Sequence, residues 1–128
     1  MDPISDMLTR IKNAQLAGRE TLEINFSKVK FEMAKIMERE GFLAQIEKKG
    51  VKDKQNLILK LKYNQGTPAI QDLRRVSKPS RRVYIGAAEI KPVKQGYGLA
   101  IISTSQGLMT AKEAKKNKLG GEILCEIW

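Results

Sequence analysis

Residues 99–113, LAIISTSQGLMTAKE, decide the fold of the second half of the chain. The first four are apolar and predict a buried strand. Three hydroxyl side chains, at residues 103–105, follow directly. Thr110 and Glu113 have the spacing of a capping box, so a short helix is expected to begin at Thr110. Adjacent hydroxyls are unsuited to a core, because each needs a hydrogen-bond partner when it is buried. The stretch therefore predicts a strand, a hydroxyl-rich loop and a capped helix.

The sequence on either side of this stretch predicts further strands. Residues 70–76 and 82–85 are strand-like and are separated by SKPS, whose proline forces a bend. Residues 86–98 are expected to hold a loop or a single turn. Residues 120–128, GGEILCEIW, predict a strand with three side chains on one face: Ile123, Cys125 and Ile127. Cys125 is then a small core residue rather than a reactive thiol.

The first half of the chain alternates helix and strand patterns. Residues 2–18 predict a helix that ends at Gly18. Its apolar face consists of Ile4, Met7, Leu8 and Ile11. Residues 21–26 predict a short strand, and Ser27 is expected to cap a second helix that ends at Gly41. The buried face of this helix is expected to hold Val29, Met33, Ile36 and Met37.

A hairpin is predicted after the second helix. Its first strand alternates Phe42, Ala44 and Ile46, and its second alternates Leu57, Leu59, Leu61 and Tyr63. The first half is thus an α-β-α-β-β unit, a sheet with two helices on one face. The turn-rich sequence NQGTP, residues 64–68, predicts a domain boundary. The fold class is α+β with two small domains, residues 1–64 and a mostly β domain with a short helix, residues 65–128.

Charge is the strongest global signal. The chain of 128 residues carries 24 Lys and Arg against 14 Asp and Glu, a net charge of +10, which favours polyanionic partners. It has no His and one Cys, which removes Ser–His and Cys–His nucleophile pairs and nearly all zinc ligands. No phosphate-binding glycine loop, signal peptide or membrane-spanning run is present in the sequence. We therefore expect a cytosolic protein that is not an enzyme and holds no cofactor or metal.

Two clusters are candidates for nucleic-acid binding. Residues 74–84, RRVSKPSRRVY, are rich in Lys and Arg, which bind phosphate, and Tyr84 offers an aromatic platform for a base. The alternative is a solvated hairpin tip that keeps the protein soluble. The hydroxyls at 103–105, with Gly107 beside them, suit a nucleic-acid backbone near a helix N-terminus. Their alternative is a local network in which the hydroxyls bond to their own loop.

The chain resembles the bacterial-type small-subunit ribosomal protein S-eight family. Four segments carry the likeness: DPISDMLTRIKNA (residues 2–14), EREGF (38–42), RRVSKPSRRVY (74–84) and AIISTSQGLMTAKEAKKNKLGGEILCEIW (100–128). The resemblance implies a two-domain α+β protein that binds the central domain of small-subunit ribosomal RNA and supports subunit assembly. Its RNA-contacting positions fall on Ser103, Thr104, Ser105, Gly107, Tyr84, Glu122, Ser77, Lys78, Arg81 and Arg82.

Two points of detail follow from the resemblance. The family usually has Gly where this chain has Ser80, and a turn that needed a positive φ there would be strained. Glu122 is an acid on a basic surface, where it either accepts a hydrogen bond from a base amino group or holds a neighbouring Arg or Lys.

The implied partners are small-subunit ribosomal RNA and neighbouring ribosomal proteins, with no membrane and no small-molecule substrate. The implied location is the cytoplasm or an organelle, in the small ribosomal subunit. A general nucleic-acid or anionic-surface binding protein outside the ribosome is the alternative function. A phosphate-handling enzyme is the third candidate function. The sequence lacks an evident catalytic base or set of metal ligands for such an enzyme.

Overall fold

The computed structural model describes residues 2–92 and 98–128, and these form two compact units. The first spans Pro3–Gln71 and the second Asp72–Trp128, with Asp2 grouped with the second by its contacts. The boundary predicted after residue 64 falls instead inside a hairpin of β4 (Tyr63–Asn64) and β5 (Thr67–Pro68). The sequence NQGTP is therefore a hairpin turn within the first unit rather than a linker.

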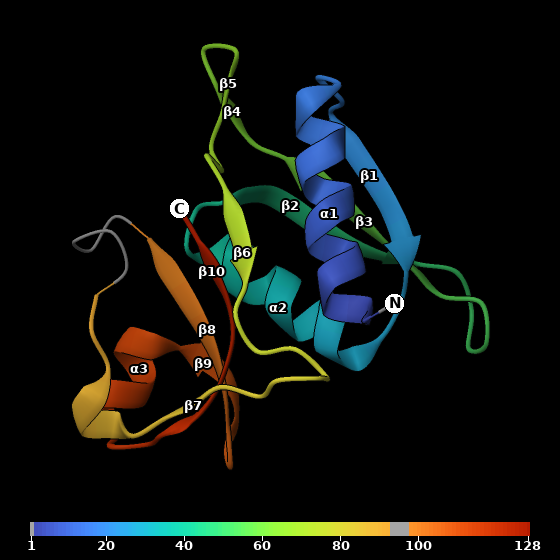
Figure 1. The fold of residues 1–128 in the computed structure, drawn as a ribbon. Helices are drawn as coiled ribbons and strands as arrows, with labels where there is room; N and C mark the ends of the chain where they lie inside the picture. The colour runs from blue at the N-terminus through green and yellow to red at the C-terminus, as the bar shows by residue number, and fades with distance from the viewer. Residues whose placement is uncertain (1, 93–97) are drawn as a thin grey trace. The chain divides into compact units, whose positions relative to one another are not determined.

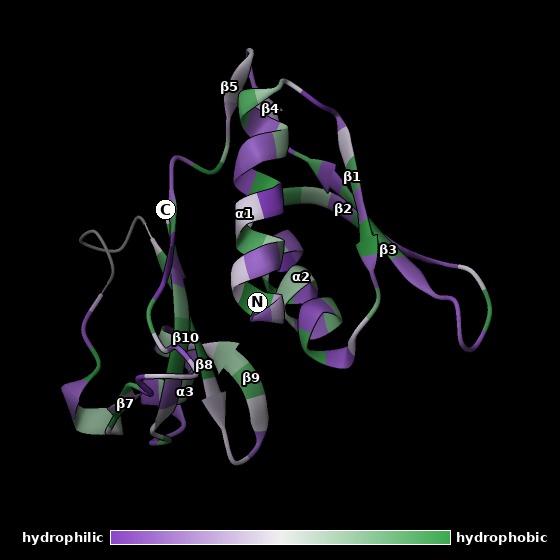
Figure 2. Cartoon of the chain, turned by 45° about the vertical axis from the view of Figure 1, so that its right-hand side comes forward, coloured by the Kyte–Doolittle hydropathy of each residue, from purple (hydrophilic) through white to green (hydrophobic). Residues whose placement is uncertain are grey.

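The first unit has the predicted α-β-α-β-β order. It contains α1 (Pro3–Leu16), β1 (Thr21–Asn25), α2 (Lys28–Arg39), β2 (Leu43–Lys49) and β3 (Asn56–Leu61). The strands form an antiparallel sheet in the order β1-β3-β2, and both helices pack on one face of it (Figure 1). The ribbon of α1 alternates hydrophobic and hydrophilic patches, as an amphipathic helix should (Figure 2).

Local signals set the ends of these helices where the sequence predicts them. The Ser27 hydroxyl accepts a hydrogen bond from the Lys30 backbone N–H at 3.2 Å and so caps α2. Gly18 and Gly41 follow the two helices with φ of +68° and +86°, a conformation that glycine adopts at little cost. The core of the unit includes the fully buried Met7, Ile11, Met33, Met37, Leu57 and Leu59.

A β-bulge in β2 overturns one predicted face. Leu43 pairs with Leu61, and Gln45 pairs with Lys60, so Ala44 is the extra residue. Leu43 is buried and Ala44 is exposed, whereas the sequence placed Ala44 on the buried face. The strict alternation of Phe42, Ala44 and Ile46 is therefore wrong, because the bulge shifts the period by one residue.

The second unit is built on a five-stranded sheet around β10 (Gly121–Ile127). This strand is antiparallel to β6 (Leu73–Arg75), β7 (Tyr84–Ile85) and β8 (Leu99–Thr104), and β9 (Gly107–Thr110) pairs with β8. The predicted strands at 70–76 and 82–85 are thus shorter than expected. A 3-10 turn at Ala87–Glu89 confirms the expected turn, while residues 93–97 of that predicted loop lie outside the described residues.

Strand β9 is an element that the sequence did not predict. The hydroxyl-rich segment is a tight hairpin turn, and residues 107–110 return alongside β8 instead of leading directly to the helix. Gly107 follows the turn with φ of +104°, which few other residues adopt. Helix α3 (Ala111–Lys116) then begins after Thr110, and the predicted capping box is present.

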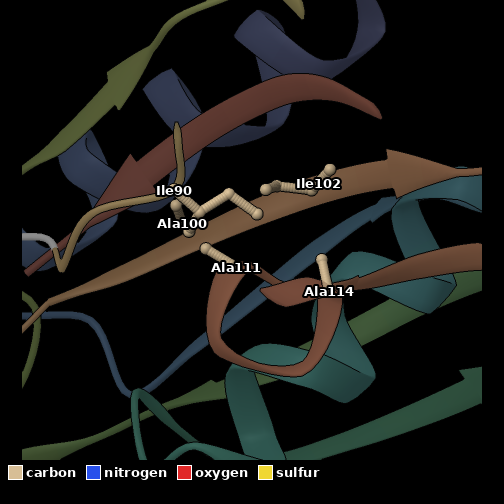
Figure 3. Close-up of a cluster of buried hydrophobic side chains, with 5 residues drawn as sticks. All are labelled: Ile90, Ala100, Ile102, Ala111 and Ala114. Atoms are coloured by element: carbon tan, nitrogen blue, oxygen red, sulfur yellow. The ribbon is translucent and has the colours of Figure 1, made fainter. Parts of the chain in front are cut away.

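Helix α3 covers one face of this sheet. Ile102 and Ala100 on β8 pack with Ala111 and Ala114 of α3 and with Ile90, as Figure 3 shows. Along a strand, successive side chains point to opposite faces. Ile101 and Ser103 consequently face away from α3.

A second bulge corrects the face predicted for the last strand. Ile123 pairs with Ile102, and Cys125 pairs with the next residue, Ile101, so Leu124 is the extra residue. Ile123 and Cys125 therefore lie on opposite faces rather than on one. Cys125 is fully buried, and burial raises the pKa of its thiol to about 12, as expected of a core residue.

Candidate nucleic-acid interface

Three predicted site residues form one row across the sheet of the second unit. Tyr84 on β7 lies opposite Glu122 on β10, and Glu122 lies opposite Ser103 on β8. Side chains of directly opposed residues share a face of the sheet, and this face is the one turned away from α3. Tyr84 is 70 % exposed. Residues distant in sequence are therefore gathered on one surface, which we call the Tyr84–Glu122–Ser103 row.

The predicted basic cluster separates into two parts. Arg75 is largely buried and donates to the Leu124 carbonyl at 2.6 Å, and Arg74 pairs with Glu126 on the facing strand. Lys78, Arg81 and Arg82 are exposed on the loop between β6 and β7, which we call the basic loop. Of the five cations, these three lie on the loop itself. Arg74 is also exposed but lies on β6, and only Arg75 is withdrawn from the surface.

The turn of the basic loop is closed by two hydrogen bonds. Lys78 N–H donates to the Arg81 carbonyl and Arg81 N–H donates to the Lys78 carbonyl, each at 2.9 Å. Pro79 and Ser80 occupy the two turn positions, and Ser80 does not have a positive φ. The turn therefore forms without glycine, and Ser80 causes no backbone strain there.

Ser77, Glu122 and Arg82 form a hydrogen-bonded network beside the row. The Ser77 hydroxyl donates to Glu122 Oε2 and accepts from the Val83 backbone N–H at 3.1 Å. Arg82 Nη1 also donates to Glu122 Oε2, at 2.9 Å. The side chain of Arg82 is half exposed, whereas Ser77 is completely buried. The structure thus places Ser77 beneath the surface, with both hydroxyl partners inside the protein.

The network shifts the ionisation of both charged members. Burial alone would raise the pKa of Glu122, but hydrogen bonds from Ser77 and Arg82 and the charges of Arg82 and Arg75 outweigh it and hold the pKa below its ordinary value. The hydrogen bond from Arg82 to Glu122, helped by the charge of that carboxylate, raises the pKa of Arg82. Of the two roles considered for Glu122, the structure shows the holding of an arginine.

The three hydroxyls of the β8–β9 turn have different surroundings. Thr104 Oγ1 donates to the Gly107 carbonyl at 2.8 Å and accepts from Gln106 N–H at 3.1 Å, which is the local network considered as the alternative. Ser103 is half-buried and Ser105 is exposed. Within residues 2–92 and 98–128, neither serine hydroxyl has a hydrogen-bond partner. Ser103 and Ser105 are therefore the hydroxyls open to a ligand.

The N-terminus of α3 is not part of this surface. Thr110 Oγ1 accepts from Glu113 N–H at 3.0 Å, and the Glu113 carboxylate accepts from Thr110 N–H at 3.1 Å. The helix end is satisfied by its own capping box, so the expected anion site there is not open.

The family described as ribosomal protein S8 matches residues 2–128. The chain belongs to this family. It is similar to the small ribosomal subunit protein uS8 of Persephonella marina, with 50% identity over 135 residues, covering 99% of this chain and 98% of the relative. The uS8 proteins of Dictyoglomus turgidum and Trichormus variabilis are each 46% identical, covering 99% of this chain and 97% of the relative.

Membership of the S8 family establishes the broad nature of the protein. It is a small-subunit ribosomal protein and not an enzyme. Among the described residues, no group of three or more His, Cys, Asp or Glu side chains is placed to hold a metal ion. The helices in the described part of the chain are all too short or too polar to cross a membrane.

A pair of glycines in this S8-family chain makes the row possible, and sequence reasoning did not assign them a role. A Cβ on Gly120 would lie 2.5 Å from the Ile85 carbonyl oxygen. A Cβ on Gly121 would overlap the Ser103 carbonyl oxygen and lie 2.9 Å from its carbon. Only glycine allows β7 and β8 to approach β10 this closely. The adjacent Gly-Gly before a strand was the available sequence signal.

The acid stability of this S8-family protein should depend on Glu122. Its pKa in the folded protein lies below the ordinary 4.5, so the contribution of the ionised carboxylate to stability is present above about pH 4.5. That contribution is lost as the pH falls through the folded pKa, because the unfolded chain then binds the proton more readily. Glu122→Gln is expected to flatten the pH dependence of the unfolding free energy below about pH 4.5, measured by urea denaturation. An unchanged profile would contradict this.

Proposed function

We propose that this S8-family protein binds ribosomal RNA of the small subunit through its second unit and so supports subunit assembly in the cytoplasm. The observation that carries the proposal is the Tyr84–Glu122–Ser103 row with the exposed basic loop beside it. The finer expectation is that the target lies in the central domain of that RNA. Neighbouring ribosomal proteins are the other proposed partners, as the names of its relatives suggest.

Each part of the surface suits a different feature of RNA. Lys78, Arg81 and Arg82 suit backbone phosphates, which fix the position of a protein without reading sequence. Tyr84 offers an exposed ring on which a base can stack. Ser103 and Ser105 offer hydroxyls that can donate or accept at a base edge or a 2′-hydroxyl. Such a mixture suits an irregular RNA helix, whose unpaired bases present edges that regular A-form RNA hides.

The two units should contribute differently. We expect residues 72–128 to discriminate between RNA sequences, because they hold the row and the basic loop. The first unit should add contact area and further phosphate contacts.

Footprinting combined with a competition series tests the proposal. Protection is expected at a discrete site when the full chain is added to naked small-subunit RNA. At one fixed salt concentration, a fragment carrying that site should compete far better than random duplex RNA. Equal competition by both would favour the alternative, a general nucleic-acid binding protein.

Ser105 and Thr104 form a matched pair that separates RNA contact from turn structure. Ser105→Ala removes an exposed hydroxyl, so the melting temperature should hardly change while specific binding weakens by about 1–2 kcal/mol. Thr104→Val removes two local hydrogen bonds, so stability should fall by about 0.5–2 kcal/mol while the folded protein keeps its affinity. Calorimetry and filter binding measure the two quantities. Loss of stability without loss of affinity for Ser105→Ala would count against the contact.

A further inference from the structure

Ser77 differs from the other predicted site residues in having no exposed surface. Its backbone N–H donates to the Ile123 carbonyl at 3.0 Å, which fixes it against β10. Ile123 N–H in turn donates to the Val83 carbonyl at 2.9 Å, and Val83 N–H donates to the Ser77 hydroxyl. Ser77 thus closes a ring of hydrogen bonds between the two arms of the basic loop and the central strand. A side chain held this way has little freedom to move toward a ligand.

The second bond of the Ser77 hydroxyl sets the position of Glu122. The hydroxyl donates to the same oxygen, Oε2, that accepts from Arg82. The side chain of Glu122 is 15% exposed, so the number of positions open to its carboxylate is small. The bond from Ser77 selects one of them, and Oε1 takes part in neither contact. The buried Ser77 hydroxyl therefore fixes the Glu122 carboxylate in the position where it pairs with Arg82.

Arg82 is the member of the network that a phosphate can reach. Its side chain is 50% exposed, and an unanchored arginine on a loop samples many rotamers. Here one nitrogen, Nη1, is bound to Glu122, while the planar guanidinium has further N–H groups for a partner. Arg82 lies two residues before Tyr84, and its partner Glu122 lies directly opposite Tyr84 in the sheet. The bound arginine is thus kept near the Tyr84–Glu122–Ser103 row.

We propose that Ser77 is a positioning residue for RNA recognition: its buried hydroxyl orients Glu122, and Glu122 holds the Arg82 guanidinium in place to meet an RNA phosphate. The inference rests on the proposed function. Ser77 then contributes to affinity without touching RNA, because a preorganised arginine loses less conformational freedom on binding. The resemblance assigned Ser77 a place among RNA-contacting residues, and the buried network gives it an indirect role instead.

Ser77→Ala, made in the full chain, distinguishes positioning from simple destabilisation. The change removes no charge, yet the salt dependence of specific RNA binding should become shallower, by up to about 0.9 in the logarithmic slope, if Arg82 no longer meets its phosphate. Affinity of the folded protein should fall about 3- to 10-fold at physiological salt. The control is Ser27→Ala, which removes the cap of α2 in the other unit and should leave slope and affinity unchanged. Ser77→Cys, which keeps the side-chain shape, replaces Ser77→Ala if the latter does not fold.

A double-mutant cycle with Arg82→Ala completes the test. In the Arg82→Ala background, Ser77→Ala should weaken binding less than twofold, because the group it positions is gone. In the free protein, Ser77→Ala should raise the pKa of the Glu122 carboxyl and increase the mobility of the Arg82 Nε–H, both measured by NMR. Full additivity, or an unchanged salt slope, would overturn the role of Ser77 while leaving the proposed function intact. Failure of the unaltered chain to prefer a ribosomal RNA fragment would overturn the proposed function and the RNA role of Ser77 together.

Discussion

Replacement of Gly121 by alanine should lower the free energy of unfolding by about 3 kcal/mol. The added Cβ would overlap backbone atoms of Ser103, and a carbonyl group in a sheet cannot rotate away as a flexible side chain can. Strands β8 and β10 would have to separate at the point where Ser103 faces Glu122. Urea denaturation followed by circular dichroism measures the loss, and specific RNA binding should fall with it.

Gly86→Ala is the matched control for this substitution. Gly86 lies at the end of β7 with φ of −80°, and the nearest atom to an added Cβ is a side-chain carbon of Glu89 at 4.0 Å. The free energy of unfolding of the Gly86→Ala variant should therefore differ from that of the unaltered protein by no more than about 0.5 kcal/mol. If the Gly121→Ala variant were as stable as the unaltered protein, β8 and β10 would not be packed as closely as described.

Removal of the three exposed cations of the basic loop should have the largest effect on binding. The triple variant Lys78→Ala, Arg81→Ala and Arg82→Ala is expected to lose about 100-fold in RNA affinity at physiological salt. The slope of log affinity against log salt should fall by about 2 to 3, since each phosphate contact contributes roughly 0.7–0.9. A titration series at several salt concentrations measures both. Thermal stability should fall only slightly, through loss of the Arg82–Glu122 ion pair, because none of the three cations is buried.

A second triple variant controls for net charge. Lys49→Ala, Lys52→Ala and Lys54→Ala remove the same three charges from the end of β2 and the loop that follows, where all three side chains are exposed. If the basic loop binds phosphates directly, this variant should lose much less affinity than the first. Equal losses would mean that the overall charge of +10, rather than the basic loop, drives binding.

Features that depend on neighbours in sequence were predictable. The caps at Ser27 and Thr110 lie where the sequence places them, because a cap involves only residues within one helical turn. The bulges in β2 and β10 were not predictable, because a bulge is defined by the partner strand. Strand β9 was not predicted for a related reason. Its four residues form a strand only because they pair with β8.

In the candidate site too, features set by nearby residues were predictable and features set by distant partners were not. Exposure of Lys78, Arg81 and Arg82 could be expected from a proline-containing basic segment. The burial of Ser77 could not, because its partner Glu122 is 45 residues away and becomes a neighbour only when β7 and β10 pair. The resemblance placed both residues near RNA, but it did not indicate which of them supports the other.

The central position of β10 determines when an RNA-binding surface can exist during synthesis. The three-stranded sheet of the first unit lies between residues 21 and 61, so it can close early. In the second unit, β8 can pair early with β9, but β6 and β7 pair with β10, which leaves the synthesising ribosome after all of them. A chain interrupted before residue 121 lacks Glu122 and the strand that aligns Tyr84 with Ser103. An interrupted product is therefore expected not to form the proposed RNA-binding surface.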